Sequence, residues 1–230
     1  MIDNTLAIIT ARGGSKRIPR KNIKDFLGRP IITYSIDAAI ESGCFGEVMV
    51  STDDAEIASI ARKSKANVPF LRTGQTSDDF ASTADVITEV LLEYSKLGKH
   101  FAYACCIYPT APFLTAAKLN TGYELIKNSD CDSVLPVVRF DYPVQRALEI
   151  KNGKLKMLWP ENREARSQDL KPAYHDAGQF YWLNVEHFLK SRILFGDNTL
   201  PIEVPACEVQ DIDTMEDWAL AEMKFRMLKK

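Results

Sequence analysis

Runs of apolar, β-branched and aromatic residues alternate with segments of helical periodicity over the first 140 residues. The apolar runs predict strands over residues 5–10, 47–52, 101–108 and 132–140. The periodic segments between them predict helices over residues 30–42, 53–65, 83–96 and 115–128. This alternation is typical of a parallel sheet wrapped by helices, where functional sites lie beyond the carboxyl ends of the strands. We therefore expect an α/β fold with its site at that edge.

The alternation stops near residue 140. Residues 140–175 are polar, charged and rich in turn formers, with one predicted hairpin in RALEIKNGKLKML. The earlier pattern resumes with a strand in GQFYWLNV (178–185), extended segments in LPIEVP and EVQDID, and a last helix from about Thr214 to Met227. We expect a single domain over residues 1–230, from which residues 140–175 form an excursion.

Composition and charge narrow the functional classes. Of the 230 residues 46% are hydrophobic, which suits one domain with a buried core, and 29 basic against 31 acidic residues leave a formal charge of -2. This balance gives no sign of a nucleic-acid partner, so any anion site must be local. No apolar run approaches the roughly 20 residues of a membrane span, and the N-terminal run lacks the basic start of an export signal. We expect a cytoplasmic protein with no membrane partner.

The five cysteines and three histidines predict no metal chemistry of their own. They form neither a C-x-x-C pair nor an H-E-x-x-H motif, which argues against a zinc site. Cys105 and Cys106 lie inside the apolar run FAYACCIY, so we expect reduced thiols that pack as small core residues.

The segment ARGGSKRIPRKN (11–22) follows the first predicted strand and concentrates positive charge around two glycines. Gly13 and Gly14 let the backbone turn and approach a ligand closely, and Pro19 disfavours an early helix, so we expect an ordered loop. Successive backbone N–H groups and guanidinium side chains suit phosphate. Ile18 breaks the P-loop pattern and Ser15 breaks the dinucleotide pattern. The alternative is a solvated basic loop without a ligand.

Longer stretches carry a resemblance to a known family. The opening IITARGGSKRIPRKNIKDFLGRPIITYSI resembles that of the CMP-acylneuraminate synthetases, as do VMVSTDDAEIA, FLRTGQTSDD, YPTAPFL and DIDTMEDW. The stretch YHDAGQFYW is most similar to the branch that acts on pseudaminic acid. The resemblance extends from residue 5 to about residue 220 and implies a three-layer, Rossmann-like nucleotidyltransferase fold with a mainly parallel sheet. It also implies a bacterial setting in which the product feeds surface glycans and flagellin glycosylation.

The reaction implied by the resemblance is attack of the anomeric hydroxyl of a sugar acid on the α-phosphate of CTP, with Mg²⁺ present and pyrophosphate released. Arg12 and Lys21 inherit the role of phosphate ligands and, with Asp211, are the expected catalytic residues. Asn22 matches the position that reads cytosine, with Arg72 and Ser82 beside it. The full set expected to bind the nucleotide is Ala11, Arg12, Gly13, Gly14, Ser15, Lys21, Asn22, Arg72 and Ser82.

Two carboxylates near the C-terminus suit a magnesium ion. An extended backbone in EVQDIDTMEDW directs Asp211 and Asp213 to one face and Ile212 toward the core. Mg²⁺ binds through one or two carboxylates together with substrate phosphates, and the resemblance assigns both aspartates as metal ligands. The alternative is that Asp213 caps the last helix in a capping box with Glu216. The earlier pair Asp53 and Asp54 predicts a helix cap only, and we leave it outside the site.

The sugar side departs from the relatives that act on sialic acid. Those carry a glutamine before their P-T-S-P motif and an arginine after it, where this chain has Tyr108 and Leu114. Both departures favour a deoxygenated diamino sugar such as pseudaminic acid, whereas Phe180, Tyr181 and Trp182 fit a buried strand. The residues expected to bind the sugar are Tyr108, Arg166, Tyr174, His175, Asp176 and Gln179.

The excursion over residues 140–175 matches the family's dimerisation arm. Leu155, Met157, Leu158 and Trp159 would be partly exposed in a monomer, which favours a homodimer. Three other functions stay open: the same reaction on N-acetylneuraminic, legionaminic or 3-deoxy-octulosonic acid, nucleotide binding without turnover, and nucleic-acid binding through the basic loop. The near-neutral charge opposes the last of these.

Overall fold

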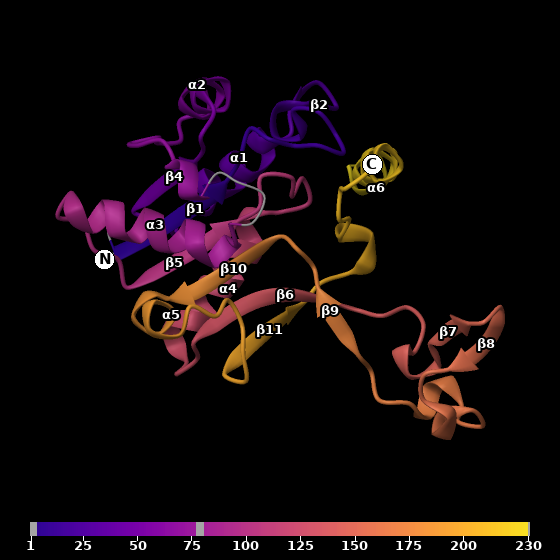
Figure 1. Cartoon of the computed structure of the whole chain (residues 1–230). Helices are drawn as coiled ribbons and strands as arrows, with labels where there is room; N and C mark the ends of the chain where they lie inside the picture. Colours follow the sequence, from indigo (N-terminus) through magenta and orange to yellow (C-terminus); the bar gives the residue numbers. More distant parts are fainter. Residues whose placement is uncertain (1–3, 77–80, 230) are drawn as a thin grey trace.

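A central sheet of seven strands organises the chain (Figure 1), whose computed structural model describes residues 4–76 and 81–229. Its strand order is β11-β6-β10-β5-β1-β4, with β9 paired to β6. The strands are β1 (Thr5–Thr10), β4 (Glu47–Ser51), β5 (Tyr103–Ile107), β6 (Ser133–Arg139), β9 (Tyr174–Asp176), β10 (Phe180–Asn184) and β11 (Thr199–Glu203). The expected strands are confirmed, except that EVQDID forms none: a 3-10 turn (Ala206–Glu208) and an irregular segment replace it.

The directions of the strands bring the loops of the site to one edge of the sheet. β1 runs parallel to β4 and β5, and β11 runs parallel to β6. β10 is antiparallel to both β5 and β6, so β5 and β6 point the same way. The carboxyl ends of β1, β4, β5 and β6 therefore share an edge with the start of β10. This arrangement confirms the mainly parallel sheet.

Helices cover both faces of the sheet and give the expected three layers (Figure 1). The helices α1 (Ile32–Ser42), α2 (Ala55–Lys63) and α4 (Ala116–Asn128) pack on one face, and α3 (Thr83–Lys96) and α5 (Val185–Ser191) pack on the other. α5 was not expected from the sequence because seven residues give too short a periodic signal. A last helix, α6 (Met215–Leu228), packs through Trp218 against a small ribbon of β2 (Asp25–Phe26) and β3 (Arg29–Pro30).

Side chains alternate between the two cores along the strands, as the period of a strand requires. Ala7 and Ile9 belong to the core under α1, α2 and α4, whereas Leu6 and Ile8 belong to the core under α3 and α5. Cys105 and Cys106 likewise divide between the two cores, fully buried and unpaired, as expected. The three aromatic residues Phe180, Tyr181 and Trp182 are buried too, which confirms the strand reading.

Side-chain caps begin several helices, and one differs from its prediction. Asp54 caps α2 as expected, accepting hydrogen bonds from the Glu56 and Ile57 N–H groups. The capping box of α6 is formed by Thr214 and Asp217, so the prediction of Asp213 with Glu216 is wrong by one residue. The correction leaves the Asp213 side chain available for other contacts.

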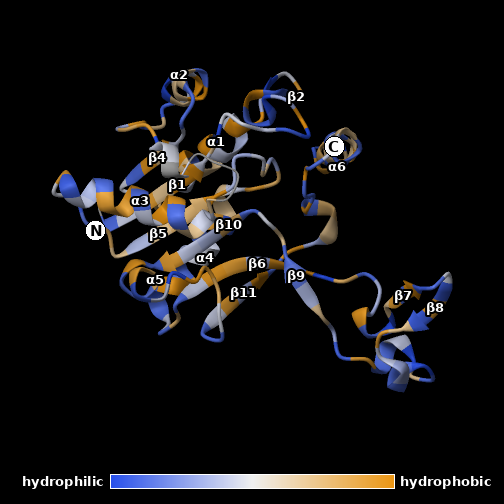
Figure 2. Cartoon of the chain, viewed as in Figure 1, coloured by the Kyte–Doolittle hydropathy of each residue, from blue (hydrophilic) through white to orange (hydrophobic). Residues whose placement is uncertain are grey.

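Residues 140–175 leave the body of the protein as an arm (Figure 1). Its tip is the expected hairpin, with strands β7 (Leu148–Lys151) and β8 (Lys154–Met157) joined through Asn152 and Gly153. Both turn residues have positive φ, as a two-residue hairpin turn of this hand requires. Hydrophobic residues of the arm are interspersed with hydrophilic ones along the hairpin (Figure 2).

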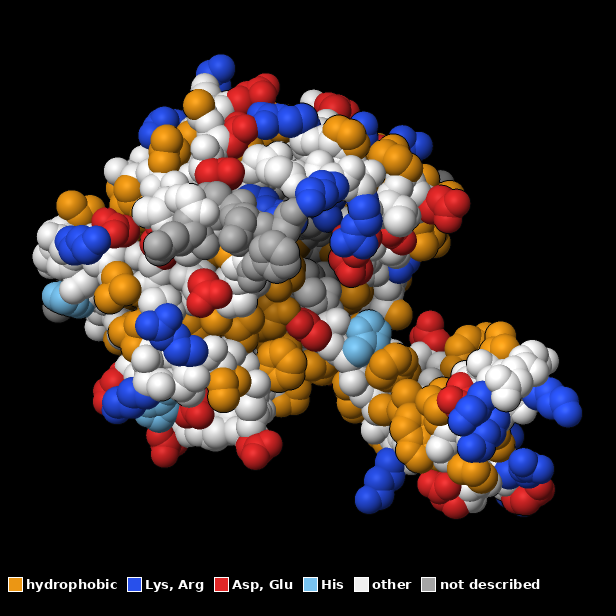
Figure 3. Space-filling model, in the orientation of Figure 1, with side chains coloured by type: hydrophobic (Ala, Val, Ile, Leu, Met, Phe, Trp, Pro, Cys, Tyr) orange, Lys and Arg blue, Asp and Glu red, His pale blue; other side chains and the backbone are white. Residues whose placement is uncertain are grey.

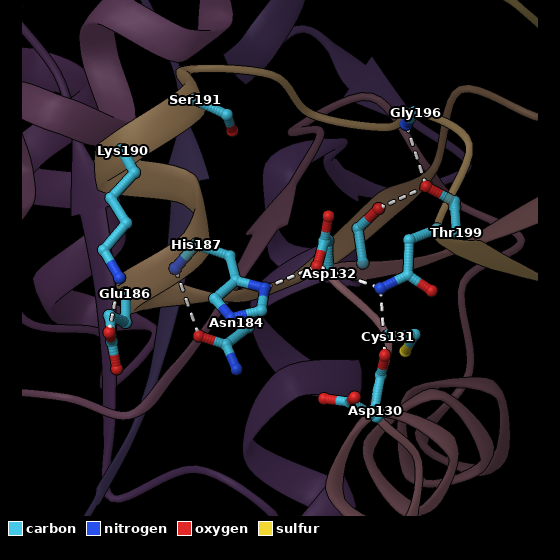
Figure 4. Close-up of polar contacts among 12 residues, drawn as sticks. Asp130, Cys131, Asp132, Asn184, Glu186, His187, Lys190, Ser191, Gly196 and Thr199 are labelled. Atoms are coloured by element: carbon cyan, nitrogen blue, oxygen red, sulfur yellow. Dashed lines mark hydrogen bonds and ion pairs between the residues drawn. The ribbon is translucent and has the colours of Figure 1, made fainter.

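The edge of the sheet opposite the site is closed by a polar cluster (Figure 4). His187 of α5 and Asn198 both bond to the Asp132 carboxylate at the start of β6, the latter at 3.1 Å. Asn198 also donates to the Asp130 carbonyl oxygen at 2.9 Å. Each polar group has a structural partner, so the cluster joins the ends of β6, β10 and β11 and takes no part in the site described below.

Candidate functional site

The basic loop over residues 11–20 is ordered and held at both ends. The Ala11 N–H donates to the Ser51 carbonyl oxygen at 2.9 Å, which ties the start of the loop to β4. Ile18 is 1% exposed and packs in the core beneath α6. Asn22, just after the loop, is also buried. Its Nδ2 donates to the Arg12 carbonyl oxygen at 2.9 Å, which joins the end of the loop to its start. The prediction of an ordered, non-helical loop is confirmed.

Gly13 is required by a close approach within the protein. Its φ is not in the left-handed region, and its N–H donates to Asp53 Oδ1 at 2.8 Å. A Cβ atom at Gly13 would lie 2.9 Å from Asp54 Oδ2, whereas a Cβ at Gly14 would meet nothing within 4 Å. The two glycines therefore differ: Gly13 lets the loop pack against the turn after β4, and Gly14 borders open space.

The loop meets the two aspartates from the far end of the chain. Lys21 Nζ donates to the Ile212 carbonyl oxygen at 2.6 Å and lies 3.4 Å from Asp213 Oδ1. Arg17 forms an ion pair with Asp213 Oδ2 at 2.8 Å. Ile212 is 1% exposed and belongs to the core, as expected from the alternating pattern. Residues 192 positions apart in the sequence thus form one basic and acidic centre.

Asp211 lies beside Asp213, and its carboxyl group has a shifted pKa. The pKa of Asp211 is raised, first because the protein removes part of its hydration and then because the Asp213 carboxylate lies close by. Within residues 4–76 and 81–229 there is no group of three or more His, Cys, Asp or Glu side chains able to hold a metal ion. Two neighbouring carboxylates could hold an ion whose remaining ligands come from a substrate, as Mg²⁺ often does.

Asp211 also lines a cavity of about 420 Å³ between the root of the arm and α6. Arg139 and Lys224 bring positive charge to this cavity, and His175 faces it from β9. Its lining residues are Val138, Arg139, Phe140, Asp141, Tyr142, His175, Ala206, Val209, Gln210, Asp211 and Lys224. Asp211 thus borders the cavity, while the neighbouring Asp213 contacts the basic loop. A larger cavity of about 630 Å³, between α1 and the end of α6, is lined by none of the predicted site residues.

Three other residues predicted for the sugar lie at or near this edge of the sheet. Asp176 accepts hydrogen bonds from the buried Tyr181 hydroxyl and, at 2.7 Å, from the Gly178 N–H. The Tyr108 ring packs on Tyr181 with 5.5 Å between centroids, and burial raises the pKa of both hydroxyls. Tyr174, on β9, directs its hydroxyl to Glu203 at 3.2 Å. Asp176 and Tyr108 are therefore linked through Tyr181.

The structure places Gln179 and Arg166 differently from the sequence-based expectation. Gln179 is 3% exposed, and its Nε2 donates to the Glu208 carbonyl oxygen at 2.6 Å. Its Oε1 has no partner within the described part of the chain. Gln179 thus supports the 206–208 turn, which leads to Asp211. Arg166 is exposed and lies on the arm, directly before the 3-10 turn Ser167–Asp169.

Arg72 and Ser82 make structural contacts. The Arg72 guanidinium donates to Ser51 Oγ and to the Ser51 carbonyl oxygen, each at 2.8 Å. Burial lowers the pKa of Arg72, while the charge of Asp53 opposes that shift. Ser82 caps α3 and is exposed, in a capping box with Asp85. Neither contact tests their predicted role in reading cytosine, which stays a prediction.

The sequence pattern assigned Asp53 to a helix cap only, which the structure corrects, and it did not point to Arg139 or Lys224. Asp53 lies two residues after the end of β4, so its place at the carboxyl edge of the sheet could have been inferred from the strand prediction. Arg139 ends β6 at the same edge and could have been found in the same way. Lys224 had no comparable signal, because only the packing of α6 brings it to the cavity.

An α/β sheet with a basic glycine loop after its first strand, met by paired carboxylates, defines a nucleotidyltransferase. The chain belongs to the cytidylyltransferase family, whose sequence profile matches residues 6–215. It is 40% identical over 223 residues to a pseudaminic acid cytidylyltransferase of Campylobacter jejuni, covering 96% of each chain. It is 29% identical over 220 residues to a CMP-N,N'-diacetyllegionaminic acid synthase of Legionella pneumophila, covering 94% of each chain.

A solved structure of a CMP:2-keto-3-deoxy-manno-octonic acid synthetase complexed with CTP shares the fold. The two superpose with a TM-score of 0.70 at 15% identity, and the match covers 98% of each chain. This similarity supports the three-layer nucleotidyltransferase architecture. None of the helices in the described residues is both long and apolar enough to cross a bilayer.

Proposed function

We propose that the protein transfers CMP from CTP to the anomeric hydroxyl of pseudaminic acid, giving CMP-pseudaminic acid and pyrophosphate. One observation carries the proposal: Asp213 contacts the basic loop while Asp211 borders a cationic cavity. A nucleotide on the loop and a sugar acid in the cavity would therefore meet at these two carboxylates. The 40% identity to a protein of that activity supports the choice of sugar.

The loop supplies the nucleotide side of the reaction. Arg12 and Lys21 hold the triphosphate with the N–H groups of residues 11–15, and Asn22, Arg72 and Ser82 lie toward the base. In the structure, Lys21 and Arg17 form ion pairs with the Asp213 carboxylate. We expect the triphosphate to compete for these two cations, because phosphate oxygens carry more charge than one carboxylate. Asp213 would then be released to act as a ligand.

Mg²⁺ fits the two aspartates by the chemistry of its ligands. Two adjacent carboxylates, one with its pKa raised by partial burial and by the other, form a hard oxygen site that a divalent cation would stabilise. When bound, the ion would offset the charge that develops on the pyrophosphate leaving group. Asp211 and Asp213 would hold it, and Lys21 would keep the phosphates beside them.

The cavity beside Asp211 supplies the sugar side. Arg139 and Lys224 provide positive charge for the carboxylate of the sugar acid, and His175 faces the same space. Tyr108, Tyr174 and Asp176 lie toward the acyl and hydroxyl groups. Gln179 contributes indirectly, because its side chain holds the 206–208 turn that leads to Asp211.

The arm supports a homodimer. Its exposed large hydrophobic residues near the hairpin, with 39–78% of their surface accessible, are Leu148, Ile150, Leu155, Leu158 and Trp159. The arm stands apart from the body, with hydrophobic side chains on its surface (Figure 3). A second copy would cover this surface and could bring Arg166 to the sugar site of its partner. The reaction would take place in the cytoplasm, where CTP is made.

Pyrophosphate release, measured with CTP, Mg²⁺ and a panel of sugar acids, tests the proposal. We expect the highest kcat/KM with pseudaminic acid and much lower values with legionaminic, N-acetylneuraminic and 3-deoxy-octulosonic acid. Binding of CTP without product from any sugar would instead favour a nucleotide-binding protein that has lost turnover.

A matched pair of substitutions on α6 tests the cavity. Lys224→Met removes a charge that lines the cavity and that also donates to the Ala206 and Val209 carbonyl oxygens, whereas Arg226→Met removes one that pairs with Glu222 elsewhere on the helix. We expect the first to raise the KM for the sugar about tenfold, as for loss of one charged hydrogen bond, and the second to leave it unchanged. Equal effects would exclude the cavity as the sugar site.

A further inference from the structure

The turn between β4 and α2, residues 52–54, holds the basic loop at two places. Asp53 accepts the Gly13 N–H at 2.8 Å near the start of the loop. Asp54 accepts a hydrogen bond from Arg20 Nη2 at 3.0 Å near its end. The Gly13 Cα packs so closely on Asp54 that a side chain there would collide with its carboxylate. The shape of the loop therefore depends on this turn.

The two aspartates of the turn accept hydrogen bonds from different parts of the protein. Asp54 caps α2, so that its carboxylate is used by the helix as well as by Arg20. Asp53 has no part in that cap. Its carboxylate accepts the Gly13 N–H at 2.8 Å. Asp53 thus contacts the basic loop and leaves the helix cap to Asp54.

We propose that Asp53 is a positioning residue that fixes the Gly13 turn before the nucleotide arrives. A binding loop already held in shape loses less conformational freedom when its ligand binds, which strengthens binding without new contacts to the ligand. The expected gain in CTP affinity rests on the proposed function. The expected order of the loop in the nucleotide-free protein does not.

Hydrogen exchange of the nucleotide-free protein tests the effect on the loop. Asp53→Ala removes the acceptor and the charge, and Asp53→Asn keeps an acceptor oxygen. Glu186→Gln removes an equal charge from α5, where Glu186 pairs with Lys190 and contacts no described residue of the loop. We expect faster exchange of the peptide covering residues 11–20 in Asp53→Ala only, with peptides from α4 unchanged. Unchanged exchange in Asp53→Ala, or equal acceleration in Glu186→Gln, would overturn the proposal.

Calorimetric titration with CTP and steady-state kinetics test the effect on binding. We expect Asp53→Ala to weaken CTP binding about tenfold and to raise the KM for CTP, leaving the KM for the sugar unchanged. Asp53→Asn should recover most of the affinity, because its amide oxygen still accepts the Gly13 N–H. Tighter binding in both variants would show that the carboxylate only repels the nucleotide, against the proposal. If the wild type binds no CTP, the proposed function is wrong, and the exchange experiment still decides the role of Asp53.

Discussion

The substitution Gly13→Ala puts the packing of the basic loop to a direct test. The new Cβ would lie 2.9 Å from Asp54 Oδ2 and 3.1 Å from Asp54 Cβ, closer than side-chain atoms normally approach. Asp54 cannot simply move away, because its Oδ1 accepts the Glu56 and Ile57 N–H groups at 2.9 Å each. The new methyl group must therefore either displace the Asp54 carboxylate from the cap of α2 or shift the backbone of the loop.

The cost follows from these contacts. Overpacking of this kind costs about 1–3 kcal/mol. Replacing glycine also stabilises the folded state by about 0.4–1 kcal/mol, because alanine restricts the unfolded chain. We expect a net loss of about 1–2 kcal/mol in the free energy of unfolding. For a chain of 230 residues this lowers the melting temperature by roughly 2–8 °C.

Thermal unfolding of the nucleotide-free protein measures the effect, with Gly14→Ala as the matched control. A Cβ at Gly14 meets nothing within 4 Å, so that variant keeps only the gain from the restricted unfolded chain and should unfold about 1–4 °C above the wild type. Equal melting temperatures for Gly13→Ala and Gly14→Ala would refute the reasoning. If the triphosphate occupies the open space beside Gly14, Gly14→Ala should nevertheless weaken CTP binding.

Three further predictions concern metal, packing and pH. Asp211→Asn should keep the fold but lower Mg²⁺-dependent turnover at least about 100-fold, measured as pyrophosphate release. Gly122→Ala should lower the free energy of unfolding by about 1–2 kcal/mol in denaturant titrations, because its Cβ would lie 2.5 Å from the buried Trp182 ring. The Arg20 hydrogen bond holds the pKa of Asp54 at about 2, below its usual 3.8. Its contribution, about 1 kcal/mol after solvent screening, is complete above pH 4 and lost as the pH falls toward 2, so Asp54→Asn and wild type should converge in stability there.

Much of the architecture follows from local patterns in the sequence. The strand TLAIIT and the helix TADVITEVLLEYSK have the predicted limits, because strand and helix periods depend only on neighbouring residues. The arm and its Asn152-Gly153 turn are also local signals. Errors arise where local signals compete or are short. Thr214 rather than Asp213 caps α6, since both positions offer a suitable side chain, and α5 is too short to show a period.

The residues of the site divide in the same way. The alternation of Asp211, Ile212 and Asp213 predicts a buried isoleucine between two aspartates on one face, and Ile212 is indeed in the core. The resemblance to a known family paired this motif with the basic loop, which residue patterns alone could not do. The buried position of Gln179 was missed, because a glutamine between a glycine and an aromatic run gives no sign of whether it faces solvent.

By itself, the sequence determined the elements, the excursion of residues 140–175, the basic loop and the D-x-D motif, since each is a property of a continuous segment. Only the tertiary structure decided that Asp53 holds Gly13, that Lys21 reaches Asp213, and that Lys224 and Arg139 line a cavity with Asp211. Gly13 and Asp53 are 40 positions apart in the sequence, and Lys21 and Asp213 are 192 positions apart. Such pairs depend on strand order and helix packing, which are set by burial of the whole core and not by any single segment.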